Sequence, residues 1–390
     1  MVAGTSIGTG ILALPAVTAN AGFGYTALLF LVCWFFMTYG ALAIMEADLW
    51  LSGESDLISM TQQLLGPIGK WITWVIYLLL LYSLICTYLL GGSNWFLEII
   101  NQYTGLHFST HLALLLFLGI FGSFVYLGTA AVDSLNRWLM LGLLITYLMI
   151  VVMAGQHVDL ALINFGNFST IPPSTPLIIT AFGFAVIVPV LTSYLQRDTH
   201  SLLKGLLLGS LLPLAVYLIW EFVILGNIPL TGENGFNQIL AKSDHGTEVI
   251  LALQRHLDNH WISSASNLFA IFAVLTSFLG VSISLFHFLA DGLNCPRRGK
   301  GGLLLILLTY LPPLLIVYLY PAGFSKILSL AGLFVAILLG LIPIAMVWAG
   351  RYRQNRPGYR LPGGKPLLLL ASLFFIYVVI QQFYNLAMGL

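Results

Sequence analysis

Long stretches without a charged residue alternate with short polar connections along almost the whole chain. A stretch of about 20 apolar residues is long enough for a helix that crosses the hydrocarbon core of a bilayer. The first stretch, 1–45, is too long for one helix, and the break at Gly22-Phe23-Gly24 divides it in two. The pattern predicts eleven membrane-spanning helices, near 3–20, 25–46, 70–98, 111–128, 136–155, 175–195, 202–225, 262–290, 302–320, 325–349 and 366–386.

The composition supports a chain whose solvent is lipid. Of its 390 residues, 59% are hydrophobic and 7% are charged, whereas a soluble domain carries about 25% charged residues. The predicted fold class is therefore all-α, a polytopic membrane protein with no room for a separate soluble domain. A net charge of +1 argues against nucleic-acid binding, which needs a basic patch.

The basic residues are distributed unevenly between the two sides that this span pattern defines. Twelve of the fifteen Lys and Arg residues fall in the alternate connections 46–70, 129–137, 196–204, 291–301 and 350–365. Basic residues mark cytoplasmic connections. We therefore expect a multi-pass protein of a bacterial inner membrane, with a cytoplasmic N-terminus and a C-terminus on the outside.

Two of the predicted spans contain residues that interrupt helices. The first holds Gly4, Gly8 and Gly10 ahead of a proline, and the sixth holds Gly183 ahead of Pro189. Because each opens a block of five helices, the chain reads as two five-helix repeats, 1–155 and 175–349, with an additional helix at 366–386. Five is an odd number, so the second repeat is inverted relative to the first.

Interrupted helices at matching positions of inverted repeats are typical of a transporter site at the membrane midplane. Backbone groups that leave a helix inside lipid need partners, which a ligand, an ion or water can supply. A small zwitterion fits, because its carboxylate accepts from free N–H groups and its ammonium donates to free carbonyls. The alternative is that the glycines of the first span form only a packing face.

Several motifs resemble those of a known family. They are the stretch from Val2 to Pro15 (VAGTSIGTGILALP), Phe182-Gly183-Phe184, Thr276-Ser277-Phe278-Leu279-Gly280-Val281, Leu289-Ala290-Asp291, Leu311-Pro312-Pro313 and Tyr359-Arg360. Together they resemble the bacterial tyrosine and tryptophan permeases of the hydroxy and aromatic amino acid permease family, within the amino acid-polyamine-organocation superfamily. The resemblance implies an eleven-helix LeuT-type fold and uptake of an aromatic amino acid driven by a proton gradient.

The resemblance also implies a substrate site. The substrate backbone would be held by Ile7, Gly8, Thr9 and Gly10 of the first helix and by Ala181, Phe182, Gly183 and Phe184 of the sixth. Tyr82 and Tyr88, near the middle of the third helix, are candidates for side-chain selectivity. Among 25 Phe, 17 Tyr and 9 Trp, the alternative is that both tyrosines are ordinary packing or interfacial residues.

The coupling ion is open at this point. Thr276 and Ser277 resemble the paired hydroxyls that bind sodium in LeuT-type transporters, although they can also be packing residues. The lysine that the resemblance implies on the fifth helix is absent after Asn136-Arg137, which weakens a lysine-based proton mechanism. Ionisable residues within spans are functional candidates. Here they are Glu46, Glu221 and His287, of which Glu221 can alternatively be interfacial and His287 a packing residue.

The leading hypothesis is a secondary transporter that imports aromatic amino acids, tyrosine first, by alternating access and proton symport. The alternatives are a sodium-coupled carrier of another neutral amino acid and a sensor that binds an amino acid without moving it. The sequence holds no His-Glu-x-x-His zinc motif and no Gly-x-x-x-x-Gly-Lys phosphate loop. We therefore expect neither an enzyme nor a bound cofactor, with the amino acid, H⁺ or Na⁺ and the bilayer as partners.

Overall fold

The chain is helical throughout the residues that its computed structural model describes, namely 8, 10–51, 53, 56–104, 109–163, 166–242, 245–321 and 323–388. The α-helices are α2 (Gly10–Thr18), α3 (Gly22–Leu49), α4 (Leu57–Thr104), α5 (Thr110–Leu127), α6 (Thr129–Gly155), α7 (Ile171–Ala181), α8 (Val188–Tyr194), α9 (Thr199–Leu225), α10 (Phe236–Leu240), α11 (His245–Leu257), α12 (His260–Gly292), α13 (Gly299–Leu319), α14 (Phe324–Val335), α15 (Ile342–Tyr352) and α16 (Gly364–Met388). Short 3₁₀ segments are η1 (Ala19–Ala21), η2 (Leu160–Leu162), η3 (Phe168–Thr170) and η4 (Gly183–Ile187), and η5 (Ala336–Leu341) is a π-helical turn.

Ten helical stretches of the described chain are long and apolar enough to cross a bilayer, which confirms a polytopic all-α membrane protein. The first stretch, Gly10–Leu49, has 40 residues, about twice the length that one crossing needs. It is divided at Gly22, where φ is 71° and ψ is 166°, so that α2 and α3 are separate helices. A total of eleven spans stays a prediction. Outward-facing leucines such as Leu115, Leu307 and Leu373 give the bundle an apolar exterior suited to lipid.

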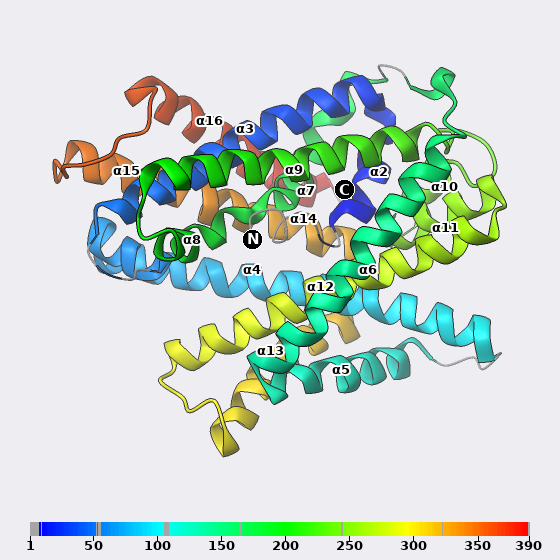
Figure 1. Ribbon diagram of the computed structural model, residues 1–390, viewed down its shortest axis with the longest axis horizontal. Coiled ribbons are helices and arrows are strands. Elements are labelled where there is room, and N and C mark those ends of the chain that lie inside the picture. The colour runs from blue at the N-terminus through cyan, green and yellow to red at the C-terminus, as the bar shows by residue number, and fades with distance from the viewer. Residues whose placement is uncertain are drawn as a thin grey trace.

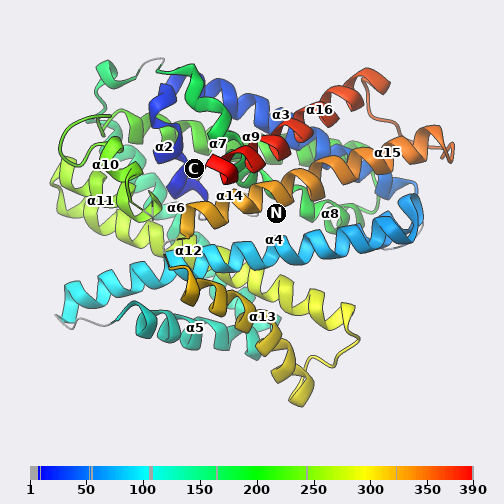
Figure 2. The same cartoon turned by 180° about the vertical axis from the view of Figure 1, so that it is seen from behind.

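The connections that carry most basic residues contact one another. The Arg197 guanidinium donates to the carbonyls of Leu51 (2.6 Å) and Gly53 (2.9 Å), and the Gln354 amide donates to the Leu64 carbonyl (3.0 Å). Figures 1 and 2 show the α3–α4, α12–α13 and α15–α16 connections at one end of the helices and the α4–α5 connection at the other. The predicted alternation of sides is therefore visible in the fold, while the side that faces the cytoplasm stays a prediction.

Two segments expected to be connections contain helices. In 46–70, α4 already begins at Leu57 and turns sharply at Gly66 (φ 82°), directly before Pro67. The long connection after α9 holds α10 and α11, and α11 buries Val249, Ile250 and Leu253. The apolar spacing of α11 gives it one buried face, which the search for charge-free stretches could not detect because Glu248 and Arg255 interrupt it.

A buried ion pair joins α3 to the C-terminal part of the bundle. Arg351 on α15 donates through Nε to Oε1 of Glu46 on α3 at 2.6 Å, and the two side chains are 3% and 0% exposed. Oε2 of Glu46 also accepts from the Leu361 N–H at 2.8 Å, and Arg351 donates to the Leu361 carbonyl at 3.0 Å. The charges of Glu46 and Arg351 are therefore paired with each other at a site buried from water.

Replacing Arg351 with Met should destabilise the protein strongly, because the Glu46 carboxylate would be left buried and unpaired. Breaking such a pair costs about 3–5 kcal/mol. Arg297→Met is the matched control, since the Arg297–Asp291 pair is exposed and worth about 1 kcal/mol or less. Thermal unfolding in detergent should show a clearly lower midpoint for Arg351→Met only. Equal midpoints for the two variants would contradict a structural role for the buried pair.

Candidate functional site

The sixth predicted span is interrupted, as the sequence indicated. Helix α7 ends at Ala181, the chain passes through Phe182 (φ −101°, ψ 25°) and the 3₁₀ turn η4, and α8 begins at Val188, directly before Pro189. We call residues 182–187 the break. The Tyr217 hydroxyl of α9 donates to the Ala181 carbonyl at 3.0 Å, so a side chain satisfies one of the carbonyls that the end of α7 frees.

Gly10 of the first span lies against Ala181, the residue at which α7 ends. Ile7 and Thr9 lie outside the described residues, while Gly8 precedes α2 and Gly10 begins it. The α2 and α7 helices lie side by side, and the Ser174 hydroxyl of α7 donates to the Val17 carbonyl of α2 at 2.6 Å. A Cβ at position 8 would collide with the Ser277 hydroxyl of α12 unless that hydroxyl rotated away, so the start of α2 lies directly against Ser277.

A cavity of about 390 Å³, here called the central cavity, lies between these elements. Such a volume is within the range of small-molecule sites, about 300–1,000 Å³. It brings together seven of the predicted residues: Gly8, Gly10, Tyr88, Ala181, Gly183, Thr276 and Ser277. Apolar walls come from α4, α6, α12 and the α14–η5 segment, through Leu80, Leu81, Leu84, Met140, Val281, Leu328, Val335 and Leu339.

Three further predicted residues lie near the cavity without lining it. Phe182 is fully buried behind the break, in edge-to-face contact with Tyr217 (ring centroids 5.4 Å apart) and Phe30 (6.2 Å). Phe184 is also fully buried. Tyr82 donates its hydroxyl to the Leu308 carbonyl of α13 at 2.8 Å, whereas Tyr88, on another face of α4, borders the cavity. The geometry therefore favours Tyr88 over Tyr82 as a contact of the ligand.

The ionisable candidates occupy three different surroundings. Glu46 is committed to Arg351. His287 on α12 pairs through Nε2 with the Thr129 hydroxyl of α6 at 3.0 Å. Glu221 on α9 is fully buried, accepts from the Thr18 hydroxyl of α2 at 3.2 Å through Oε2, and has no partner for Oε1 within the described ranges.

Sequence reasoning missed the contributions of α6 and of the tenth span to the cavity. Asn136 and Met140 line it from α6, and Leu339 lines it from the π-helical turn. Pro343 lacks the N–H that would bond to the carbonyl four residues earlier, at Leu339, which fits a local widening of the helix. This proline inside an apolar stretch was a usable signal. The inward direction of Asn136 had none, because α6 carries no sharp apolar stripe.

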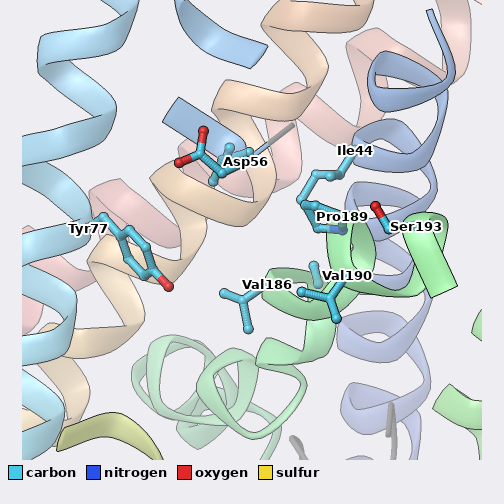
Figure 3. Close-up of a pocket in the computed structure, with 9 residues that line it drawn as sticks. Ile44, Asp56, Tyr77, Val186, Pro189, Val190 and Ser193 are labelled. Atoms are coloured by element: carbon cyan, nitrogen blue, oxygen red, sulfur yellow. The ribbon is translucent and has the colours of Figure 1, made fainter. Parts of the chain in front are cut away.

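A second cavity, of about 310 Å³, adjoins the first and is here called the vestibule. Tyr77 of α4 and Val186 of the break line both cavities. In Figure 3, Tyr77 projects from α4 toward Val186, while Pro189, Val190 and Ser193 form the opposite wall and Asp56 lies at the rim. Asp56 precedes α4 in the 46–70 connection, one of the five that together hold twelve of the fifteen basic residues, so the vestibule leads from the central cavity toward that side.

Comparison with known proteins identifies the family. The profile of the tryptophan/tyrosine permease family matches residues 1–382. The chain belongs to the tryptophan/tyrosine permease family. It is 31% identical over 388 residues to "Tyrosine-specific transport system 1" of Haemophilus influenzae, covering 97% of this chain and 94% of the relative. The permease is also 29% identical to the "Tryptophan-specific transport protein" of Haemophilus influenzae (98% and 94% covered) and 28% identical to "Glutamine transporter 2" of Aliivibrio fischeri (98% and 97% covered).

Gly8→Leu should abolish transport by the permease while leaving membrane insertion intact. The added side chain would occupy the space between the start of α2 and Ser277, where the central cavity is bordered on both sides. Gly119→Leu on α5 is the control, because a Cβ there meets nothing within 4 Å. Uptake into cells at equal membrane levels distinguishes the two variants. If Gly8→Leu took up substrate as well as the wild type, the Gly8 end of the cavity would not be part of the substrate site.

Proposed function

We propose that this chain imports aromatic amino acids, tyrosine first, by alternating access in symport with protons. The observation that carries the proposal is the central cavity, which is bordered by the glycines of α2, by the break after α7 and by apolar walls. Relatives along the whole chain are named as tyrosine-specific and tryptophan-specific transport proteins. An apolar cavity with backbone at one side suits a zwitterion that carries a large apolar side chain.

The helix ends supply the charges that such a zwitterion needs. The first N–H groups of α2 and the last carbonyls of α7 lack partners within their own helices. The positive end of the α2 dipole favours the substrate carboxylate, and the negative end of α7 favours its ammonium. The same arrangement supports the proposal that 1–155 and 175–349 are inverted repeats, because α2 and the α7–α8 pair would then be equivalent elements.

The two sides of the cavity differ, and this difference supports alternating access. Toward the vestibule, Tyr77 and Val186 border both hollow spaces. Behind the break, the fully buried rings of Phe30, Phe182 and Tyr217 pack together. We therefore propose that this conformation is inward-facing, with a closed outer side. Transport would require the ring cluster to separate while the vestibule closes.

Glu221 is the proposed proton carrier. It lies one helical turn beyond Tyr217 on α9, and its Thr18 partner lies at the end of α2, so it contacts a helix that borders the substrate. A buried carboxylate with one unpartnered oxygen is costly when charged, which favours proton binding in this conformation. Glu46 is already paired with Arg351, and His287 lies at the far end of α12, so both are weaker candidates.

Proteoliposomes separate the two coupling ions. We expect radiolabelled tyrosine to accumulate when a proton gradient alone is imposed, and a sodium gradient alone should have no effect. Accumulation that requires sodium, and that is lost in Thr276→Val, would contradict proton symport. Saturable uptake of other neutral amino acids with no uptake of tyrosine or tryptophan would contradict the substrate class.

Glu221→Gln should uncouple transport, because the amide imitates the protonated acid at all pH values. Accumulation driven by the proton gradient should fall to background, while exchange of internal for external tyrosine should continue. Glu248→Gln, which alters an ion pair with Lys242 in the α10–α11 connection, should leave both activities unchanged. Full accumulation by Glu221→Gln would exclude Glu221 as the proton carrier.

One alternative has a structural basis. Thr276 lines the cavity and its hydroxyl donates to the Phe272 carbonyl at 2.8 Å within its own helix, so the oxygen keeps lone pairs that could bind a cation. Sodium coupling would use this oxygen together with Ser277. One relative is named as a glutamine transporter. Under this alternative, the substrate would be another neutral amino acid. A non-transporting sensor on the same fold would bind tyrosine without counterflow.

The sequence Gly4-Thr5-Ser6-Ile7-Gly8 fits the Gly-x-Ser-x-Gly pattern of hydrolases. In those enzymes the serine stands on a strand-to-helix turn at the edge of a sheet. The described part of this chain contains helices and no strand, and the family is one of permeases. The glycines therefore support a substrate site better than a nucleophile.

A further inference from the structure

The central cavity contains one buried side-chain atom whose hydrogen bond is unmade. Asn136 lines the cavity, but its Oδ1 is covered by protein atoms and accepts no hydrogen bond in the part of the chain that the structure describes. A buried acceptor without a partner costs about 1–3 kcal/mol, so such atoms are rare unless a ligand or water completes them. Rotation of the carboxamide about χ2 would turn Oδ1 to the cavity surface, where a donor that arrives with the substrate could complete the bond.

Three hydroxyls of the cavity wall already donate to carbonyls of their own helices. Thr180 donates to the Leu177 carbonyl at 2.6 Å, and Ser284 donates to the Gly280 carbonyl at 2.7 Å. Thr276 donates to its own helix in the same way. These bonds keep hydroxyls satisfied when the cavity is empty. Oδ1 of Asn136 differs from these hydroxyl oxygens in that it takes part in no hydrogen bond within the described chain.

The position of Asn136 along the bundle can be read from two contacts between α6 and α12. Thr129 pairs with His287, and Gly142 lies against the Phe272 ring. These antiparallel anchors place Asn136 beside Gly280, which lines the same cavity. Gly280 lies three residues beyond Ser277 along α12, about 4.5 Å at 1.5 Å per residue. Gly8 lies against Ser277. Asn136 therefore lies in a part of the cavity about one helical turn away from the start of α2.

The surroundings of Asn136 are those of a side-chain pocket. Met140 follows it by one turn on α6, Val281 lies on α12, and Leu80 and Leu84 face them from α4. An aromatic ring placed there would contact these apolar groups, with the Asn136 carboxamide near its edge. In such a pocket, a fixed acceptor discriminates strongly, because a ligand without the donor leaves that acceptor unpaired.

We propose that Asn136 is a specificity-determining residue that accepts a hydrogen bond from the substrate side chain through Oδ1. The donor is a phenol hydroxyl or an indole N–H. Aromatic amino acids that carry such a donor are thereby preferred over phenylalanine. The inference rests on the proposed function, because it assigns the selectivity of the same site.

Uptake by the wild type and by variants of Asn136 tests the proposal. For the wild type, tyrosine should compete with labelled substrate at least about tenfold better than phenylalanine, and tryptophan should compete better than 1-methyltryptophan, which lacks the N–H. Asn136→Leu should raise the KM for tyrosine by about tenfold or more and leave that for phenylalanine nearly unchanged. Asn136→Asp, which keeps an acceptor, should retain the preference for tyrosine.

Met140→Leu is the matched control, since it alters the same wall of the cavity without removing a hydrogen-bonding group. Its tyrosine-to-phenylalanine ratio should equal that of the wild type. Equal losses for tyrosine and phenylalanine in Asn136→Leu would overturn the proposal, because Asn136 would then serve the substrate backbone or the fold. Equal competition by phenylalanine and tyrosine in the wild type would overturn it without any variant. Failure of the wild type to take up any aromatic amino acid would instead contradict the proposed function.

Discussion

The structure depends on one constraint, which is that a polar backbone group inside a bilayer must have a hydrogen-bonding partner. A continuous helix satisfies this rule by itself, whereas the break at residues 182–187 does not. The chain meets the requirement partly with side chains, as where Tyr217 donates to the Ala181 carbonyl and Ser174 donates to the Val17 carbonyl. The groups that remain border the central cavity. An unwound segment is thus the part of the bundle that is least able to satisfy its own backbone hydrogen bonds. It is also the part best suited to hold a zwitterion.

Close approach of the helices makes this arrangement possible. Glycine at position 8 lets the start of α2 reach Ser277, and Gly40 of α3 lets it reach the Leu339 carbonyl in the π-helical turn. Gly8, Ser277 and Leu339 also line the central cavity, so packing and binding share residues. The Glu46–Arg351 pair, remote from the cavity, joins α3 to α15 near the basic connections. A rigid frame of this kind allows movement to be concentrated at the broken helices.

The sequence supported the architecture better than the details of the site. Charge-free stretches predicted the membrane-spanning helices because the cost of charge in lipid acts on every residue of a span. Gly183 and Pro189 predicted the break because backbone chemistry alone disfavours a regular helix there. The directions of Tyr82 and Tyr88 could not be predicted, since they depend on how α4 rotates against α13. Asn136 was missed for the same reason, and α11 was missed because its charged face interrupts its apolar one.

The most direct test of the account is a high-resolution structure of the permease with tyrosine bound. The account predicts density in the central cavity, with the amino acid backbone between Gly8 and Gly183 and the ring directed toward α6. Tyrosine bound only in the vestibule, or outside both cavities, would contradict the claim that the broken helices form the substrate site.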